Sequence, residues 1–211
     1  MQWTSRQPFV PPSVLDRLDR ARLRRAALRY AAHGWMVTPG AYLSGRRFHC
    51  GRPGCPITGC HPALETWAES ATGDPARILG WWRHRPHAVL LTTGESFDVL
   101  EVPSALARRA PGIGPAAVTA DGRWMFLVRP GLPLRPELDR RLDVVLHGTG
   151  SWVPAPPSRM PEGPVRWAVT PDETGWRLPD AGTVQQLFAG AVAPACPLSV
   201  PRQLSTSRRA A

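Results

Sequence analysis

The first periodic segment of the chain predicts a helix over residues 13–32. Ser13 stands in the position of an N-cap, and His33-Gly34 follows the last apolar residue of the pattern. Arginines cover much of the remaining helix surface, which is typical of a solvated face and also compatible with phosphate contacts. The apolar residues at approximately helical spacing, which we expect to be buried, are Leu15, Leu18, Leu23, Ala27, Tyr30 and Ala31.

A second helix is predicted over residues 74–86. Asp74 is a suitable N-cap, and Pro75 is favoured at the first helical position because its missing N–H would have no partner there. The apolar residues of this segment, Ile78, Trp81 and Trp82, are most simply explained as core.

Beyond residue 86 the pattern changes to short apolar segments separated by turns, which predicts strands. Asp121-Gly122 favours a hairpin, because this dipeptide tolerates positive backbone angles. Since helices come first and strands dominate later, we expect an α+β fold with a mixed or antiparallel sheet flanked by helices. The expected strands are 87–93, 97–102, 116–119 and 124–128, followed by the pairs 142–146 with 151–153 and 165–170 with 175–178, and a short helix at 182–190.

Composition divides the chain into three parts. Residues 1–12 are aperiodic and contain proline, so we expect a flexible arm, and residues 192–211 form a basic tail with too little apolar content to order itself. Residues 13–191 are expected to form one domain. No apolar run approaches membrane-spanning length and the N-terminus lacks a signal-peptide hydrophobic region, so we expect a cytoplasmic protein without a membrane partner.

The charge balance is strongly basic. The chain has 26 basic residues, all of them arginine, against 16 acidic ones, which gives a net charge of +10. This charge favours a polyanionic partner such as nucleic acid or a nucleotide. A generally basic protein without an acidic partner is the alternative.

The loop 46–62 carries the sharpest chemical signal. Cys50, Cys55, Cys60 and His61 fall within twelve residues and are separated by Gly/Pro turns. Three thiols and an imidazole can form a closed, structural zinc site, with His49 as an alternative nitrogen donor. The spacing is not that of a standard zinc finger, and the alternative is a surface loop with unpaired thiols or one exposed disulfide.

Taken in order, several segments resemble the bifunctional DNA primase/polymerase (Prim-Pol) domain of the archaeo-eukaryotic primase superfamily. The resemblance covers about residues 26–178 and implies a mixed sheet flanked by helices and template-directed nucleotide addition. The matching segments are ALRYAAHGWMVTP (27–39), GCHP (59–62), ATGDPARILGWWRHRPHAVLLTTG (71–94), FDVLEVP (97–103), TADGRWMFLV (119–128) and APPS (155–158).

The carboxylates that this resemblance implies are incomplete. Family members present Asp-x-Asp on a strand, so that two carboxylates on one face hold two divalent metals. Here the triplet is Glu101-Val102-Pro103: Glu101 can still ligate magnesium or manganese, but Pro103 has no side-chain oxygen. Asp98 is an odd number of residues away and faces the opposite side of a regular strand. Asp143 is the candidate for the third carboxylate, although an ungapped match places Val145 there.

Two further positions depart from the family pattern. The Gly-Gly-x-His hairpin, whose histidine helps to hold nucleotide phosphates, is matched by residues 121–124, so Trp124 replaces the histidine and Arg123 offers a charge. Cys60 stands where the family has the lysine of Gly-Lys-x-Pro. Together these losses predict a catalytically degenerate domain.

We therefore expect a module that binds nucleic acid, in particular single-stranded DNA, or nucleotides in a basic cleft without polymerising. Arg123, Trp124, Arg83 and Arg85 are the candidate contacts. One alternative is an active primase/polymerase that uses Glu101 with Asp98 or Asp143 and magnesium or manganese. A protein-interaction scaffold that has kept only the fold is the other, and a neutral cleft mouth with the arginines scattered elsewhere would favour it.

Overall fold

The computed structural model describes residues 14–190. The expected N-cap Ser13, the arm 1–12 and the tail 192–211 lie outside the described residues. Within them, every helix is too short or too polar to span a lipid bilayer.

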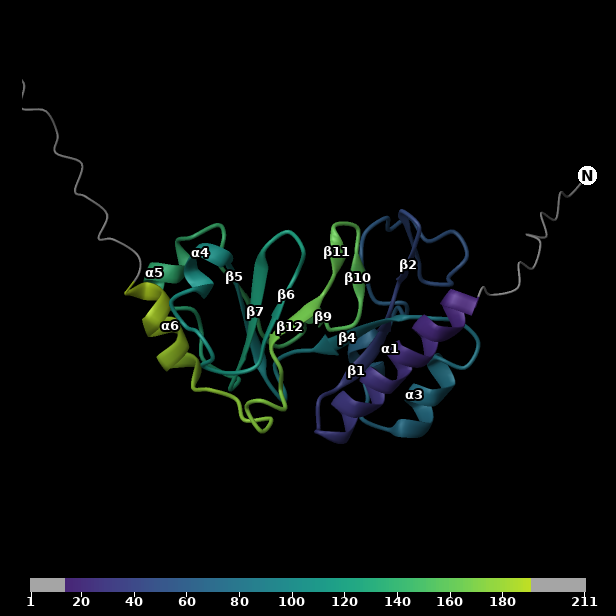
Figure 1. Ribbon diagram of the computed structural model, residues 1–211, viewed down its shortest axis with the longest axis horizontal. Helices are drawn as coiled ribbons and strands as arrows, with labels where there is room; N and C mark the ends of the chain where they lie inside the picture. The colour runs from purple at the N-terminus through teal and green to yellow at the C-terminus, as the bar shows by residue number, and fades with distance from the viewer. Residues whose placement is uncertain (1–13, 191–211) are drawn as a thin grey trace, which may run out of the picture.

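One half of the molecule is built on a three-stranded antiparallel sheet. Its order is β1 (Val37–Gly40), β4 (Ala88–Thr92), β9 (Trp152–Pro154). α1 (Val14–Ala32) packs against this sheet and against α3 (Pro75–Trp81), on the right in Figure 1. α1 ends where the sequence predicts, at a turn in which Gly34 has φ +79°, and Asp74 caps α3 by accepting a hydrogen bond from the Ala76 N–H.

The other half is built on a five-stranded antiparallel sheet. Three short helices lie at its outer side, on the left in Figure 1: α4 (Ser104–Ala107), α5 (Pro136–Asp139) and α6 (Ala181–Ala189). The strand order of the sheet is β12 (Arg166–Val169), β6 (Ala116–Val118), β7 (Arg123–Val128), β5 (Asp98–Pro103), β8 (Val145–His147).

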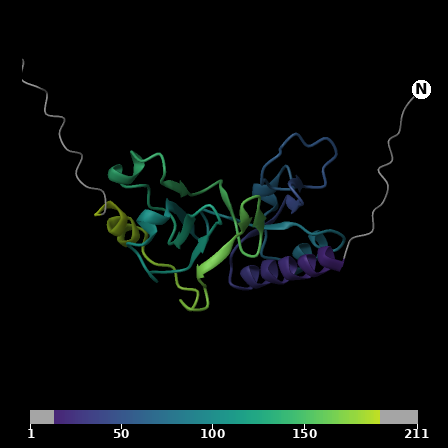
Figure 2. The same cartoon turned by 45° about the horizontal axis from the view of Figure 1, so that its top comes forward.

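The remaining elements are small. They comprise the hairpins β2 (Tyr42–Ser44) with β3 (Arg47–His49) and β10 (Arg159–Met160) with β11 (Gly163–Pro164), and the helix α2 (Trp67–Ser70). Both views place the hairpin of β10 and β11 between the two halves (Figures 1 and 2).

The expected α+β fold is confirmed, and all strand pairs among the described residues are antiparallel. Two expected strand pairs are wrong. Strands β8 and β9 do not pair with each other, because β8 adds to β5 and β9 adds to β4 in the other sheet. Segment 175–178 is not a strand, and β12 pairs with β6 instead. Leu18 is also not core, since 62% of it is exposed.

The two faces of β5 contact different hydrophobic clusters. Val99 belongs to the cluster shared by α1, β4 and β7, which joins the two halves. Leu100 and Val102 point to the opposite face, into the cluster under α4 and α6. Because side chains alternate along a strand, Glu101 lies on the Val99 face, at the junction of the two sheets.

Candidate functional site: the Glu101 cavity and the cysteine loop

Glu101 opens into a cavity of about 480 Å³ between the two sheets. Strands β5, β7 and β8 supply one wall through Glu101, Arg123 and His147, and β9 supplies the opposite wall, including Trp152. Cys60, from the cysteine loop, also lines the cavity. This is the position in which the sequence resemblance places the metal carboxylates of a primase/polymerase.

Both carboxylate oxygens of Glu101 have partners. Arg123 Nε donates to Oε1 at 2.7 Å, and His147 Nε2 lies 2.8 Å from Oε2. Since an ionised carboxylate only accepts hydrogen bonds, Nε2 of His147 carries the proton in this contact. The side chains of Glu101, Arg123 and His147 are 20–24% exposed, so the three groups are partly shielded from water.

Local structure fixes the position of the Arg123 guanidinium. The turn before it requires Gly122 at φ +87°, and β7 then pairs Arg123 with Pro103 of β5. Arg123 therefore lies diagonally across from Glu101, and its Nη1 also donates to the backbone oxygen of Asp143 at 2.8 Å. The cation occupies the face on which a second carboxylate at position 103 would stand.

The pKa of Glu101 is lowered from its ordinary value. The hydrogen bond with His147 is the largest cause, burial opposes it, and the hydrogen bond and charge of Arg123 lower the pKa further. Glu101 is thus held as an anion by groups of the protein itself.

Asp98 does not share the Glu101 cavity. It is only 4% exposed and lies on the Leu100 face of β5, where Oδ2 accepts a hydrogen bond from the Gly131 N–H at 2.8 Å. Its Oδ1 has no hydrogen-bond partner among the described residues. A three-residue separation on a regular strand accounts for this placement, and the strand contains no bulge that would turn Asp98 toward Glu101.

Asp143 is also directed elsewhere. It precedes β8, and its carboxylate makes two hydrogen bonds with Arg141, at 2.9 and 2.7 Å. The side chain is 43% exposed and does not line the cavity. The residue paired with Glu101 on β8 is Val145, so the ungapped alignment agrees with the strand register.

The charge of the cavity is the opposite of the expected basic cleft. Its lining includes the carboxylates of Glu101, Asp121 and Glu162 against one guanidinium, that of Arg123, with His147 as the remaining titratable base of the cluster. Such a cavity repels phosphate groups in the absence of metal ions.

The other candidate nucleotide contacts lie outside this cavity. Trp124 points to the opposite face of β7 and stacks on Phe126 with ring centroids 5.9 Å apart. Arg83 and Arg85 follow α3, and the Arg85 guanidinium lies against Gly51 of the cysteine loop. The structure therefore brings only Arg123, of these four residues, together with Glu101.

The cysteine loop assembles three donors. One ligand atom each from Cys50, Cys55 and His61 lies within 4.8 Å of the others, so this group could hold a metal ion. The Cys55 Sγ to His61 Nε2 distance is 3.4 Å, close to the separation of about 3.5 Å that tetrahedral zinc bonds of ~2.3 Å to sulfur and ~2.0 Å to nitrogen imply. His61 Nδ1 lies 2.8 Å from the Gly59 carbonyl, which fixes this nitrogen as the donor and leaves Nε2 for a ligand.

Arg52 supports the thiolate character of this group. Burial raises the pKa of Cys50, but the hydrogen bonds that Arg52 donates from its backbone N–H and its guanidinium, together with the contact to the His61 ring, outweigh it and lower the pKa to about 6. Arg52 Nη2 also contacts Cys55 Sγ at 3.5 Å. A lowered thiol pKa favours the form that binds metals.

Cys60 is separate from this group. Its thiol lines the Glu101 cavity, and burial raises its pKa to about 12. The sequence resemblance aligns Cys60 with the lysine of the family's Gly-Lys-x-Pro motif, and its place in the Glu101 cavity agrees with that alignment. His49 is exposed on β3 and lines the same space as Cys50, Cys55 and His61, which Cys60 does not line, so it is the candidate for a fourth ligand.

Comparison with known families gives a clear result. The sequence profile of Prim-Pol, described as bifunctional DNA primase/polymerase, N-terminal, matches residues 27–181. The chain belongs to the Prim-Pol family. No curated protein matches it significantly. The profile spans Glu101, Arg123 and His147, so the cavity belongs to the Prim-Pol domain itself.

His147 is the residue of this site that sequence reasoning missed. It ends β8, two residues after Val145, which puts it on the same sheet face as Glu101. The strand was expected to end at Leu146, and nothing local to residues 142–147 indicates that this segment pairs with β5. The available signal was the alternation of side chains along a strand: on one continuous strand, Asp143, Val145 and His147 would all lie on the same face.

Proposed function

We propose that this Prim-Pol domain does not polymerise and that it binds nucleic acid. The observation that carries the proposal is the engagement of both Glu101 carboxylate oxygens by Arg123 and His147. A divalent metal at Glu101 competes with these partners for the carboxylate, and beside it stands the guanidinium of Arg123 in place of a second carboxylate.

The residues of the cavity do not fit the two divalent ions that nucleotidyl transfer requires. Pro103 offers no side-chain ligand, Asp98 is bonded on the other face of β5, and Asp143 is paired with Arg141. Within residues 14–190, the cysteine loop is the one place where three His, Cys, Asp or Glu side chains bring ligand atoms within 4.8 Å. We therefore derive no catalytic step through magnesium or manganese.

Nucleic-acid binding is supported by two independent facts. The domain belongs to a family described by its action on DNA, and the chain carries a net charge of +10. Arginine-rich surfaces bind the phosphate backbone by releasing counterions, which needs no catalytic metal. Because the Glu101 cavity is acidic, the polyanion binds on another surface in this proposal.

For the cysteine loop we propose a structural zinc ion held by Cys50, Cys55 and His61, with His49 as the fourth ligand. Thiolate and imidazole donors match the preference of zinc. The loop between β3 and α2 contains no regular strand or helix and packs on only a small cluster that includes Cys50 and Ala63, so a metal would add stability to it.

Two assays test the proposed function together. In primer extension on a single-stranded template with magnesium or manganese, we expect no product beyond that of the Glu101→Ala variant. In fluorescence anisotropy with labelled single-stranded DNA, we expect binding that weakens steeply with salt. Extension that Glu101→Ala abolishes would establish an active polymerase, and absence of binding even at low ionic strength would favour a protein-interaction scaffold.

A further inference from the structure

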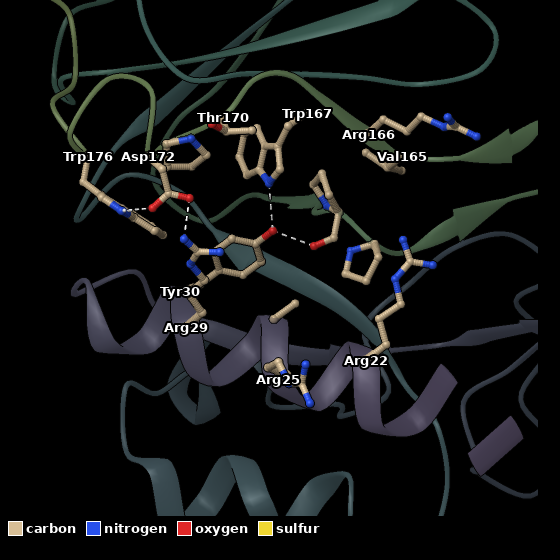
Figure 3. A pocket seen from close by; sticks show the side chains of 14 residues that line it. Arg22, Arg25, Arg29, Tyr30, Val165, Arg166, Trp167, Thr170, Asp172 and Trp176 are labelled. Atoms are coloured by element: carbon tan, nitrogen blue, oxygen red, sulfur yellow. Dashed lines mark hydrogen bonds and ion pairs between the residues drawn. The ribbon is translucent and has the colours of Figure 1, made fainter. Parts of the chain in front are cut away.

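A groove of about 390 Å³ runs between α1 and β12, on the outside of the junction between the two halves. Figure 3 shows side chains that extend from α1 toward Val165 and toward Arg166 and Trp167 at the start of β12. The groove does not share a lining residue with the Glu101 cavity. It is therefore a second, separate site.

One face of α1 supplies a row of arginines to this groove. Arg22, Arg25 and Arg29 are spaced by three and four residues, so they share a helix face, and all three are exposed. The row extends over about 10 Å of helix axis, at 1.5 Å per residue. Arg166 adds a fourth exposed guanidinium from β12.

Most of this charge is uncompensated. Arg29 pairs with Asp172, the only acidic residue among the described residues that line the groove, and lies 5.8 Å from the Trp176 ring. Among the described residues, no carboxylate forms an ion pair with Arg22, Arg25 or Arg166. Four guanidiniums against one carboxylate make this groove attractive to a polyanion, whereas the Glu101 cavity has three carboxylates against one guanidinium.

The floor of the groove is apolar and fixed. The Tyr30 hydroxyl donates to the Pro156 carbonyl and accepts from the Trp167 ring N–H at 3.1 Å, as the dashed lines in Figure 3 show. Tyr30 is buried, while Trp167 remains partly exposed beside Pro156 and Pro157. A flat ring surface next to a row of arginines is the combination with which proteins bind unpaired bases and their phosphates.

We infer that this groove binds single-stranded nucleic acid, with phosphates on Arg22, Arg25 and Arg166 and a base against Trp167. This inference rests on the proposed function and assigns it a surface. A row of cations about 10 Å long exceeds what one phosphate contacts, which favours a chain of phosphates over a free phosphate ion. The volume is in the range of pockets for small organic groups, which suits an unstacked base.

The aromatic floor distinguishes this occupant from an acidic peptide. Carboxylates would satisfy the arginines equally well, but aspartate and glutamate side chains have no ring to place on Trp167. A nucleotide supplies both the phosphate charge and, in its base, the flat apolar surface.

The test uses the full chain and a fluorescein-labelled oligothymidine of about 20 nucleotides, a length that exceeds one binding site of this kind. The groove variants are Arg22→Gln with Arg25→Gln, and Arg166→Gln alone. The matched control is Arg108→Gln with Arg109→Gln, two exposed arginines after α4 that do not line the groove. All these side chains are exposed, so the variants keep the fold, which circular dichroism verifies.

We expect the double groove variant to bind roughly tenfold more weakly at low salt, and the slope of log affinity against log salt to fall by about 0.7 for each lost phosphate contact. The control should change affinity by less than about twofold, because it removes charge without removing a contact. If the groove and control variants lose the same affinity for the oligothymidine, the groove is not the binding surface, while the proposed nucleic-acid binding still stands.

A competition experiment separates the two kinds of polyanion. Unlabelled oligothymidine should displace the probe at far lower concentration than poly-glutamate of the same charge. Displacement by poly-glutamate at equal concentration would overturn the assignment to nucleic acid. Absence of wild-type binding at low salt would instead overturn the proposed function itself.

Discussion

Arg123 Nε lies 2.7 Å from Glu101 Oε1, diagonally across strands β7 and β5. The resemblance to Prim-Pol assigns Glu101 to the carboxylates that hold metal ions. Here the guanidinium of Arg123 supplies part of the positive charge that metal ions would place beside Glu101. His147 completes the arrangement from β8. Two side chains of the Prim-Pol domain itself thus bind both oxygens of this carboxylate.

The Arg123–Glu101 pair should stabilise the fold. Arg123→Met leaves Glu101 partly buried with one partner fewer, and we expect the free energy of unfolding to fall by about 1–3 kcal/mol. Chemical denaturation measures this change. Arg129→Met is the control, because the Arg129–Asp180 pair is 63% and 52% exposed and should contribute at most about 1 kcal/mol. If Arg123→Met and Arg129→Met lower the free energy of unfolding by the same small amount, Arg123 does not stabilise the fold through Glu101.

The stabilisation by Glu101 should depend on pH. Its pKa is lower in the folded state than in an unfolded chain, so the ionised form stabilises the fold above the unfolded value, and this contribution is lost as pH falls through the folded pKa. We expect Glu101→Gln to be less stable than wild type near about pH 7 and the difference to shrink toward about pH 3. Denaturation of both proteins over a pH series measures this difference in stability, and a difference that does not change with pH would contradict the stabilisation by ionised Glu101.

The loop after His147 should depend on a glycine elsewhere in the chain. Gly94 has φ +100°, and a Cβ there would collide with the backbone of Thr149. Gly94→Ala therefore should displace the 148–150 loop and cost roughly 2–4 kcal/mol of unfolding free energy, from strain and overlap together. Gly150→Ala, at φ +78° with open space around it, should cost only about 1 kcal/mol. Similar losses in the two variants would mean that the close contact at Thr149 is unimportant.

The cysteine loop should bind one zinc ion per chain. We expect Cys50→Ser and His61→Ala to lose the metal, as measured by elemental analysis of the purified protein, and to melt at lower temperature. Chelation of wild type should lower its melting temperature as well, because metal binding stabilises the ordered loop.

Cys60→Ser is the matched control for this site, since its thiol lies in the Glu101 cavity and not with the other three donors. It should keep the zinc ion. Loss of zinc in Cys60→Ser, with retention in His61→Ala, would contradict the ligand set.

Local sequence signals predicted much of the fold. The C-terminal end of α1, the start of α3, the hairpin at Gly122 and the α+β order follow from periodicity, capping and turn residues, which act over a few positions. The predicted end of the second helix at residue 86 is wrong, because α3 already ends at Trp81. The opposite orientation of Asp98 also followed from strand parity alone. The family match was predicted from motif order, and the profile over residues 27–181 confirms it.

Long-range pairing set the limit of prediction. The partner strand of β8 is β5, more than 40 residues earlier, and no turn or periodicity encodes that choice, so His147 was missed as a partner of Glu101. The path of the cysteine loop likewise separates Cys60 from Cys50 and Cys55 although their spacing is even. The acidic charge of the cavity depends on Asp121 and Glu162 converging from separate hairpins.

Binding of manganese to the Glu101 cavity tests the central claim most directly. Titration calorimetry of the zinc-loaded full chain with Mn²⁺ and a nucleoside triphosphate, compared with the Glu101→Ala variant, counts the ions that depend on this carboxylate. We predict identical titrations, because Arg123 and His147 already occupy both oxygens of Glu101. Two manganese ions bound by wild type and lost in Glu101→Ala would contradict the account.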